Sequence, residues 1–228
     1  MKKYYYTIIT ILFLGLLSCS NEETKTQTEV ATRPTVPILN GQVRIGTQVW
    51  MTKNLNVTRY RNGDPIPQVT NSFSWGFLTT GAWCNYNNNP VNGIFYGRLY
   101  NWYAVNDPRG LAPLGWHVAT AEEWLTLQSY LGGQEGVIQS LWNYESIGNN
   151  SSGFTALRGG YRDPSMPNPE SPFPDFEGLQ SYYANWWTST NSSSIEYRGL
   201  CYWLDSFDPS GLNSGYYGEG HYVRCVKD

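Results

Sequence analysis

Apolar and polar residues alternate at the start of the region that follows residue 40, and this pattern predicts a β-hairpin. The apolar positions are Val43, Ile45, Val49 and Met51, with Gly46-Thr47 between the two pairs. Successive side chains of a strand point to opposite faces, so a period of two allows one face of each strand to be buried. We therefore expect two short strands joined by a tight turn.

Helical spacing of apolar residues comes next, in residues 97–105. Leu99, Trp102 and Tyr103 fall on one side of a helix, which predicts a short helix here. Its apolar face is interpreted as part of the core and not as a ligand site.

Residues 120–123 (TAEE) have the composition of a capping box at the start of a second helix. The Thr120 hydroxyl can accept from the Glu123 amide while the Glu123 carboxylate accepts from the Thr120 amide. Apolar residues follow at helical spacing, and Gly132-Gly133 predicts the end of the helix. Glu122 and Glu123 are not interpreted as a catalytic pair, because adjacent helical residues point about 100° apart.

The last third of the chain predicts strands. Residues 186–190 (WWTST) are typical of a buried strand, and residues 196–204 and 216–226 predict two more. Before them, residues 164–174 contain five prolines, which favour a surface excursion with little regular structure. The predicted order is therefore helices early and strands late.

The composition is rich in rings and poor in charge, with 16% aromatic and 14% charged residues. Each aromatic side chain can bury roughly 150–250 Å², so a sizeable core is available. Without Lys2 and Lys3, basic residues fall from 15 to 13 against 18 acidic ones, and the net charge changes from −3 to −5. Neutralising phosphates requires clustered Lys and Arg, so we expect no nucleic-acid partner.

The first residues have the layout of a secretory signal. Two lysines precede an apolar stretch, residues 4–17, that is shorter than the about 20 residues that span a bilayer. Residues 16–19 (LLSC) then resemble a bacterial lipoprotein signal, in which the Cys thiol receives lipid and becomes the first residue. We expect residues 1–18 to be a signal peptide and Cys19 to be lipidated. An ordinary cleaved signal or a short anchor is the alternative.

Residues 19–39 predict a flexible tether. They are rich in Thr, Glu, Gln and Lys and lack aromatic residues, so they cannot bury enough apolar area to offset chain entropy. The pair Glu22-Glu23 is similar to surface-export signals of Bacteroidetes lipoproteins. We therefore expect one domain, residues 40–228, held by its lipid at the cell envelope, in the outer membrane or at the cell surface.

Few residues suggest catalysis or a transition-metal site. The two histidines, His117 and His221, are far apart, and no His-Glu-x-x-His, phosphate-binding glycine loop or Gly-x-Ser-x-Gly occurs. We expect His117 to make structural hydrogen bonds. Three cysteines follow the lipidation site, Cys84, Cys201 and Cys225, and no two have the spacing of a zinc site. The sequence does not predict an enzyme.

Oxygen-bearing side chains near the end of the chain form a candidate calcium site. They are Asp205, Asp208, Asn213 and Glu219. Calcium takes oxygen ligands from such groups, but their spacing fits no EF-hand loop. A solvated loop is the alternative, and calcium is the one cofactor that the sequence leaves open.

Aromatic residues of the same region form a candidate ligand surface. They are Tyr202, Trp203, Tyr216, Tyr217 and Tyr222, of which the first four are the predicted contacts. A ring face can stack on a sugar while a neighbouring amide or carboxylate bonds its hydroxyls. The alternative is that these rings fill a core poor in Leu and Val, and alternation along a strand would bury about half of them.

Five segments carry a family resemblance. They are residues 46–56 (GTQVWMTKNLN), 96–104 (YGRLYNWYA), 114–124 (LGWHVATAEEW), 186–190 (WWTST) and 223–228 (VRCVKD). In this order they resemble the Fibrobacter succinogenes major paralogous domain of secreted and surface proteins, over roughly residues 41–228. That domain is in turn similar to the superfamily of C-type-lectin-like domains and formylglycine-generating enzymes. The resemblance implies an α+β fold, with two helices flanking a small twisted antiparallel sheet and with long loops.

Two departures from the superfamily bear on chemistry. The oxidase branch holds copper on a close cysteine pair, whereas Cys201 and Cys225 are far apart in sequence, so this activity is not expected. Many relatives carry a Cys before the proline of residues 111–114 (LAPL), and the disulfide to that position is lost here. We expect Cys201 and Cys225 to bridge neighbouring strands instead.

The sequence thus predicts a lipid-anchored binding module that presents loops to a polysaccharide or a surface protein. A structural or adhesin component is the alternative, and a degenerate formylglycine-generating-type enzyme is less favoured. Fold resemblance alone does not establish sugar binding, so the question becomes which rings and amides reach the surface.

Overall fold

The computed structural model describes residues 41–142, 148–163, 176–179, 183–191, 198–205 and 211–228. The helices are α1 (Ser72–Gly76), α2 (Pro90–Tyr96), α3 (Trp102–Val105), α4 (Ala121–Tyr130) and α5 (Gly133–Leu141), with a 3-10 turn at Tyr86–Asn88. The strands are β1 (Gln42–Ile45), β2 (Gln48–Met51), β3 (Trp83–Cys84), β4 (Leu99–Tyr100), β5 (Trp116–Val118), β6 (Gly159–Arg162), β7 (Phe176–Leu179), β8 (Tyr183–Asn191), β9 (Arg198–Asp205), β10 (Leu212–Tyr216), β11 (Tyr222–Val223) and β12 (Cys225–Lys227). The expected signal, Cys19, the tether and the proline-rich segment lie outside the described residues. No helix within the described ranges is long and apolar enough to cross a membrane.

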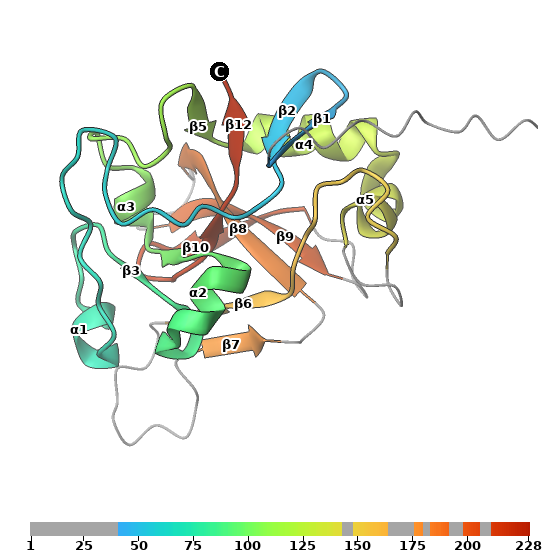
Figure 1. Cartoon of the computed structure of the whole chain (residues 1–228). Coiled ribbons are helices and arrows are strands. Elements are labelled where there is room, and N and C mark those ends of the chain that lie inside the picture. Colours follow the sequence, from blue (N-terminus) through green and yellow to red (C-terminus); the bar gives the residue numbers. More distant parts are fainter. Residues whose placement is uncertain (1–40, 143–147, 164–175, 180–182, 192–197, 206–210) are drawn as a thin grey trace, which may run out of the picture. The chain divides into compact units, whose positions relative to one another are not determined.

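Most strands belong to two four-stranded sheets. The first has the order β1-β2-β12-β5, with β12 between β2 and β5 (Figure 1). The second has the order β10-β9-β8-β11, in which only β11 runs parallel to its neighbour. This arrangement confirms the α+β class. The finer expectation of two helices around one small sheet is not confirmed, since the described part contains five α-helices and four sheets.

The predicted hairpin is formed by β1 and β2, and its inward face differs in one respect from the expectation. Val43 lies opposite Trp50, and both are buried together with Ile45. Val49 and Met51 are only partly buried. The inward residue of β2 is therefore Trp50, because cross-strand neighbours share one face of a sheet.

The predicted capping box starts α4. Thr120 Oγ1 accepts from the Glu123 amide at 3.1 Å, and a Glu123 carboxylate oxygen accepts from the Thr120 amide at 2.8 Å. Gly132, just beyond the helix, has a φ of +96°, a conformation that glycine adopts at little cost. A further helix, α5, begins at once with Gly133, and the sequence pattern did not predict it.

The helix expected over residues 97–105 is only partly correct. Its first half contains β4, which pairs with β3, and only α3 is helical. Asn101 separates the two elements, because its buried side chain accepts from the amides of Ala82 at 2.9 Å and Ala104 at 3.1 Å. One side chain thus caps α3 and holds it to the neighbouring strand segment.

Strands β8 and β9 confirm two of the three strands expected in the last third, but the strand expected over residues 216–226 is wrong as a single element. A turn interrupts it, because the Glu219 amide donates to the Tyr216 carbonyl at 2.8 Å. Beyond the turn, His221 exchanges backbone hydrogen bonds with Tyr100. The segment is therefore divided among β10 and β11, at the two edges of the second sheet, and β12, in the first sheet.

Packed rings form the centre of the core around Trp124. The distances from its ring centroid are 4.5 Å to Tyr202, 4.8 Å to Trp50, 5.3 Å to Trp186 and 5.7 Å to Phe154. All five side chains are buried. Aromatic rings bury a large apolar area each, so they compensate for the small number of aliphatic residues.

Arg224, between β11 and β12, is fully buried in this core. Its guanidinium lies 4.1 Å from the ring centroid of Phe154. It donates to the carbonyl oxygens of Met51 at 2.8 Å and Phe154 at 2.7 Å, and to Asn54 Oδ1 at 3.0 Å. Burial lowers the pKa of Arg224 to about 9. One side chain therefore ties the end of the chain to the first hairpin.

Candidate functional site

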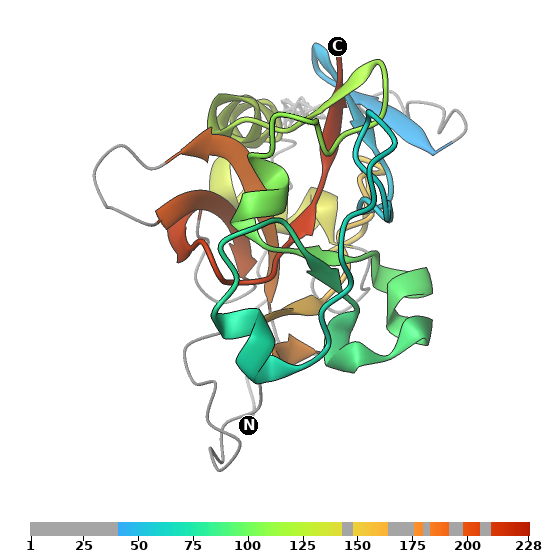
Figure 2. The same cartoon turned by 90° about the vertical axis from the view of Figure 1, so that its left-hand side faces the viewer.

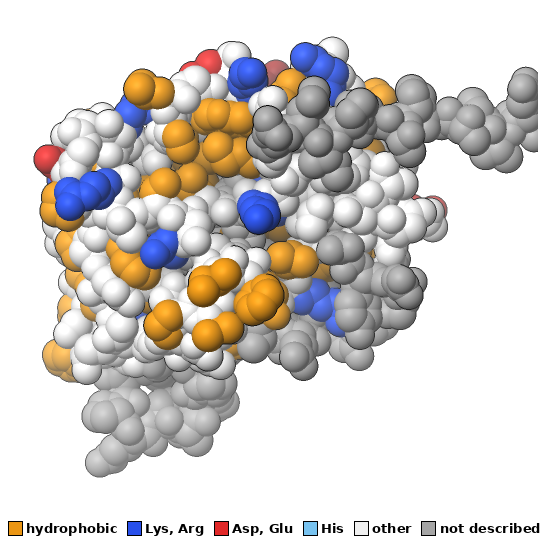
Figure 3. All heavy atoms as spheres, viewed as in Figure 1, with side chains coloured by type: hydrophobic (Ala, Val, Ile, Leu, Met, Phe, Trp, Pro, Cys, Tyr) orange, Lys and Arg blue, Asp and Glu red, His pale blue; other side chains and the backbone are white. Residues whose placement is uncertain are grey.

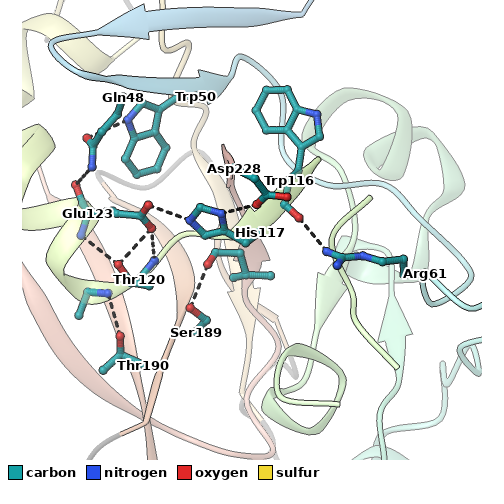
Figure 4. A network of polar contacts seen from close by, with 12 residues as sticks. Gln48, Trp50, Arg61, Trp116, His117, Thr120, Glu123, Ser189, Thr190 and Asp228 are labelled. Carbon is teal, nitrogen blue, oxygen red and sulfur yellow. Dashed lines mark hydrogen bonds and ion pairs between the residues drawn. The ribbon is translucent and has the colours of Figure 1, made fainter. Parts of the chain in front are cut away.

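His117, in β5, lies between two carboxylates (Figure 4). Its Nε2 is 2.7 Å from Glu123 Oε1, and its Nδ1 is 2.8 Å from Asp228 Oδ1. Burial acts to lower the pKa of His117, but the hydrogen bonds to Asp228 and Glu123 outweigh it, and the pKa is raised. With both ring nitrogens bonded to carboxylates, neither is placed to take a proton from a nucleophile. The hydrogen bonds predicted for His117 are therefore present, and its structural role stays a prediction.

Of the four rings predicted to contact a ligand, Tyr202 does not reach the surface. Its buried ring stacks on Trp124 with 8° between the planes, and its hydroxyl donates to Gln128 Oε1 at 3.1 Å. Tyr202 is therefore not one of the exposed rings that the prediction required. Alternation along β9 turns this residue toward α4 and turns Cys201 and Trp203 toward the opposite face.

Tyr216 and Tyr217 do reach the surface, and Tyr216 is 51% exposed. Tyr217 stacks on Trp102 with ring centroids 5.9 Å apart and planes 10° apart, and it meets Tyr103 edge-on at 5.6 Å. Its hydroxyl donates to Asn191 Oδ1 at 3.0 Å. We call Tyr103, Asn191, Tyr216 and Tyr217 the tyrosine ledge. Tyr103 belongs to α3 and Asn191 to β8, and these two elements pack beside each other (Figure 2).

The disulfide expected between Cys201 and Cys225 is not formed, and both are buried free thiols. They lie on β9 and β12, which belong to different sheets and are not neighbours. Cys201 Sγ instead accepts from Trp203 Nε1 at 2.9 Å. Burial raises the pKa of the Cys225 thiol to about 12 and also raises that of Cys201. Since the thiolate is the metal-binding form, these side chains are poorly suited to hold a soft metal.

The four candidate calcium ligands do not form a site within the described ranges. Asp208 lies outside those ranges, and of Asp205 only the backbone is described, opposite Tyr183 in the sheet. Asn213 is exposed, and its Oδ1 accepts from the next backbone amide at 2.9 Å. Among the described residues no three His, Cys, Asp or Glu side chains are placed to hold a metal ion. Calcium binding stays a prediction.

Glu219, the fourth of those candidates, instead forms a carboxylate–histidine pair that sequence reasoning missed. Its Oε2 lies 2.7 Å from Nε2 of the fully buried His221, and its Oε1 accepts from the Tyr216 amide at 3.1 Å. The His221 ring stacks on Tyr161 at 5.4 Å and meets the edge of Trp187 at 4.5 Å. Both carboxylate oxygens are therefore bonded to protein donors.

Asn185, in β8, is the other polar residue that the sequence analysis missed. Its side chain is fully buried, and its Oδ1 and Nδ2 have no hydrogen-bond partner, nor does His221 Nδ1. Because β11 runs parallel to β8 with Tyr222 opposite Trp186, His221 lies level with Asn185. We call Asn185, Glu219 and His221 the His221 cluster. The sequence signal for Asn185 was its place directly before the apolar pair Trp186-Trp187.

Exposed apolar side chains gather on two short helices. Val91, Ile94 and Phe95 are exposed on α2, where Figure 3 shows a group of hydrophobic side chains. Phe73, on α1, and Phe77, directly after it, are exposed with their ring centroids 4.8 Å apart. Neither helix contains a charged residue. These five residues, named together the α1–α2 patch, form one exposed apolar group at each helix, and exposed apolar groups are typical of interaction surfaces.

Comparison with protein-family models gives a match to the Fibrobacter succinogenes major domain over residues 43–227. The match includes the tyrosine ledge, the His221 cluster and the α1–α2 patch. Searches of curated proteins and of solved structures gave no match. A relationship to C-type-lectin-like domains or formylglycine-generating enzymes therefore stays a prediction.

Proposed function

Because the chain belongs to the Fibrobacter succinogenes major domain family, we propose that it is a lipid-anchored module that works outside the cytoplasm and binds a glycan. Membership in the family does not name a ligand. The proposal therefore rests on the residues of this chain, and above all on the tyrosine ledge.

The lipid anchor is proposed from the first residues of the sequence. Cys19 follows a short apolar stretch that begins after two lysines, and it is the first residue of the tether, residues 19–39, which precedes the domain. An extended segment of this length reaches ~70 Å, which allows the domain to stand well clear of a membrane surface. The proposed location is the cell envelope, in the outer membrane or at the cell surface.

The observation that carries the glycan proposal is the fixed position of the Tyr217 ring. Stacking on Trp102 and the hydrogen bond to Asn191 hold this ring beside an exposed amide. The preceding residue, Tyr216, is 51% exposed and adds a second ring that reaches solvent. A flat ring face beside polar groups is the combination that binds the apolar face and the hydroxyls of a sugar.

An oxidase activity is less well supported by the arrangement of side chains. Burial keeps the thiols of Cys201 and Cys225 protonated near neutral pH, and the two residues lie in different sheets. Both nitrogens of His117 are bonded to carboxylates. These groups are therefore suited to structural roles.

The test is a glycan array probed with the full chain purified in detergent, with and without calcium. Reproducible binding to a defined set of glycans supports the proposal. Failure to bind any glycan under both conditions contradicts it and directs attention to a protein partner.

The α1–α2 patch favours a second candidate function, a structural or adhesin component that assembles with copies of itself. Sedimentation velocity over a range of concentrations tests this candidate. Ile94→Ser and Phe95→Ser should shift any oligomer toward monomer, while Leu114→Ser, at an 81% exposed position outside both helices, should not. A wild-type chain that stays monomeric throughout contradicts the candidate.

A further inference from the structure

Three buried polar atoms close to the tyrosine ledge have no hydrogen-bond partner. They are Oδ1 and Nδ2 of Asn185 and Nδ1 of His221, and both side chains are 0% exposed. Buried polar groups of native proteins are nearly always hydrogen-bonded, so each exception requires an explanation. Two such residues at the same level of neighbouring strands point to one shared cause.

We propose that Asn185 and His221 bind a pair of neighbouring hydroxyl groups of a neutral sugar. The inference rests on the proposed glycan-binding function and assigns to it a second group of contacts, separate from the ledge.

The hydrogen-bonding capacity of the cluster matches hydroxyl groups. In the tautomer that carries its proton on Nε2, His221 donates to the Glu219 carboxylate and leaves Nδ1 as an acceptor. Asn185 adds one acceptor and one donor group. A hydroxyl both donates and accepts, so two adjacent hydroxyls can satisfy all three atoms. An anionic ligand is disfavoured, because it would lie close to the negative charge of Glu219.

Aromatic rings surround these polar atoms. Tyr161 stacks on His221, and its ring centroid lies 6.0 Å from that of Trp203, the cross-strand neighbour of Asn185. Trp187 meets His221 from another side. Apolar walls with a few placed polar groups are typical of small-ligand sites.

The cluster is held rigidly before any ligand arrives. The backbone of His221 is bonded in both directions to Tyr100, and Glu219 is bonded to the Tyr216 amide. Gly215 permits this close packing, since a Cβ there would lie 2.7 Å from Glu219 Oε2 and 2.8 Å from Trp187 Cη2. A rigid site loses little entropy on binding.

Access requires a ring to move. Asn185 and His221 are fully buried, whereas Tyr161 and Trp203 are partly exposed and lie over the cluster. Binding should therefore be slow for a sugar, and Tyr161→Ala should speed association. Stopped-flow tryptophan fluorescence can follow this step, because Trp187 and Trp203 lie at the cluster.

The test compares Asn185→Leu with the wild-type full chain in detergent. Calorimetric titration with glucose, galactose, mannose and glycerol measures binding, and thermal melting measures stability. Asn185→Leu should weaken sugar binding by about tenfold or more, since two hydrogen-bonding atoms are lost. Its melting temperature should equal or exceed that of the wild type, because an unsatisfied buried amide is replaced by an apolar group of similar shape. Asn149→Leu, at an exposed amide between α5 and β6, is the matched control and should leave sugar binding unchanged and the melting temperature nearly so.

The outcomes separate this inference from the proposed function. Asn185→Leu that melts at a lower temperature and binds sugar as well as the wild type overturns the inference, since the amide is then structural. A wild-type chain that binds none of these sugars overturns the inference too, while the glycan array decides the proposed function independently. If Asn185→Leu does not fold, Asn185→Ala takes its place with the same expected loss of binding.

Discussion

His117 Nε2 lies 2.7 Å from Glu123 Oε1, and this contact joins strand β5 to the carboxylate that caps helix α4. The same carboxylate accepts from the Thr120 amide, so one side chain serves both the cap and the histidine. We predict that His117→Ala lowers the free energy of unfolding by about 1 kcal/mol, a modest value because the pair is partly exposed to solvent. Urea denaturation of both chains measures the difference. An unchanged midpoint together with lost ligand binding would point to a functional role instead.

The same residue predicts a dependence of stability on pH. The pKa of His117 is raised in the folded chain, so the protonated imidazole is favoured by folding. Its stabilisation is fully present below the unfolded pKa of about 6.5 and is lost as the pH rises through the folded pKa. The difference in melting temperature between wild type and His117→Ala should therefore shrink from about pH 6 to about pH 9. A difference that grows over this range would contradict the assignment.

Arg224 predicts a much larger effect on stability. Its described hydrogen-bond partners are neutral oxygens, among them the carbonyls of Met51 and Phe154. Arg224→Met should lower the free energy of unfolding by roughly 3 kcal/mol, because several buried acceptors lose their donor. Arg59→Met, at an exposed arginine, is the control and should leave the denaturation midpoint nearly unchanged. Equal midpoints for the two variants would contradict the role given to Arg224.

Cys19 predicts where the chain is found. Cys19→Ala removes the thiol that would receive lipid. The variant should therefore lack the mass of the acyl chains, and it should move from the detergent phase to the aqueous phase. Phase separation in Triton X-114, followed by intact-mass analysis, measures both. If wild type and variant have the same partition and neither carries a lipid, the anchor is wrong.

Local signals in the sequence predicted part of this fold. The capping box, the first hairpin and the strand with Trp186 and Trp187 each depend on neighbouring residues, and each is present. The burial of Tyr202 was not predictable, because alternation says that half of the residues in a strand face inward without saying which half.

Contacts between distant segments decided the rest. The region expected as one last strand is interrupted because His221 pairs with Tyr100, and no local pattern indicates such a pairing. The free thiols of Cys201 and Cys225 follow from the placement of β9 and β12 in separate sheets. The candidate site was thus predicted in part, with Tyr216 and Tyr217 at the surface, while Asn185 and the pairing of Glu219 with His221 were not predicted.

The most direct test of glycan binding is a calorimetric titration of the full chain with the best ligand from the array. Wild type, Tyr217→Ala and Tyr130→Ala are compared, since Tyr130 is a half-exposed tyrosine on α4, away from the ledge. The account predicts that Tyr217→Ala weakens binding by about tenfold or more, while Tyr130→Ala binds like the wild type. Equal affinities for all three chains would contradict it.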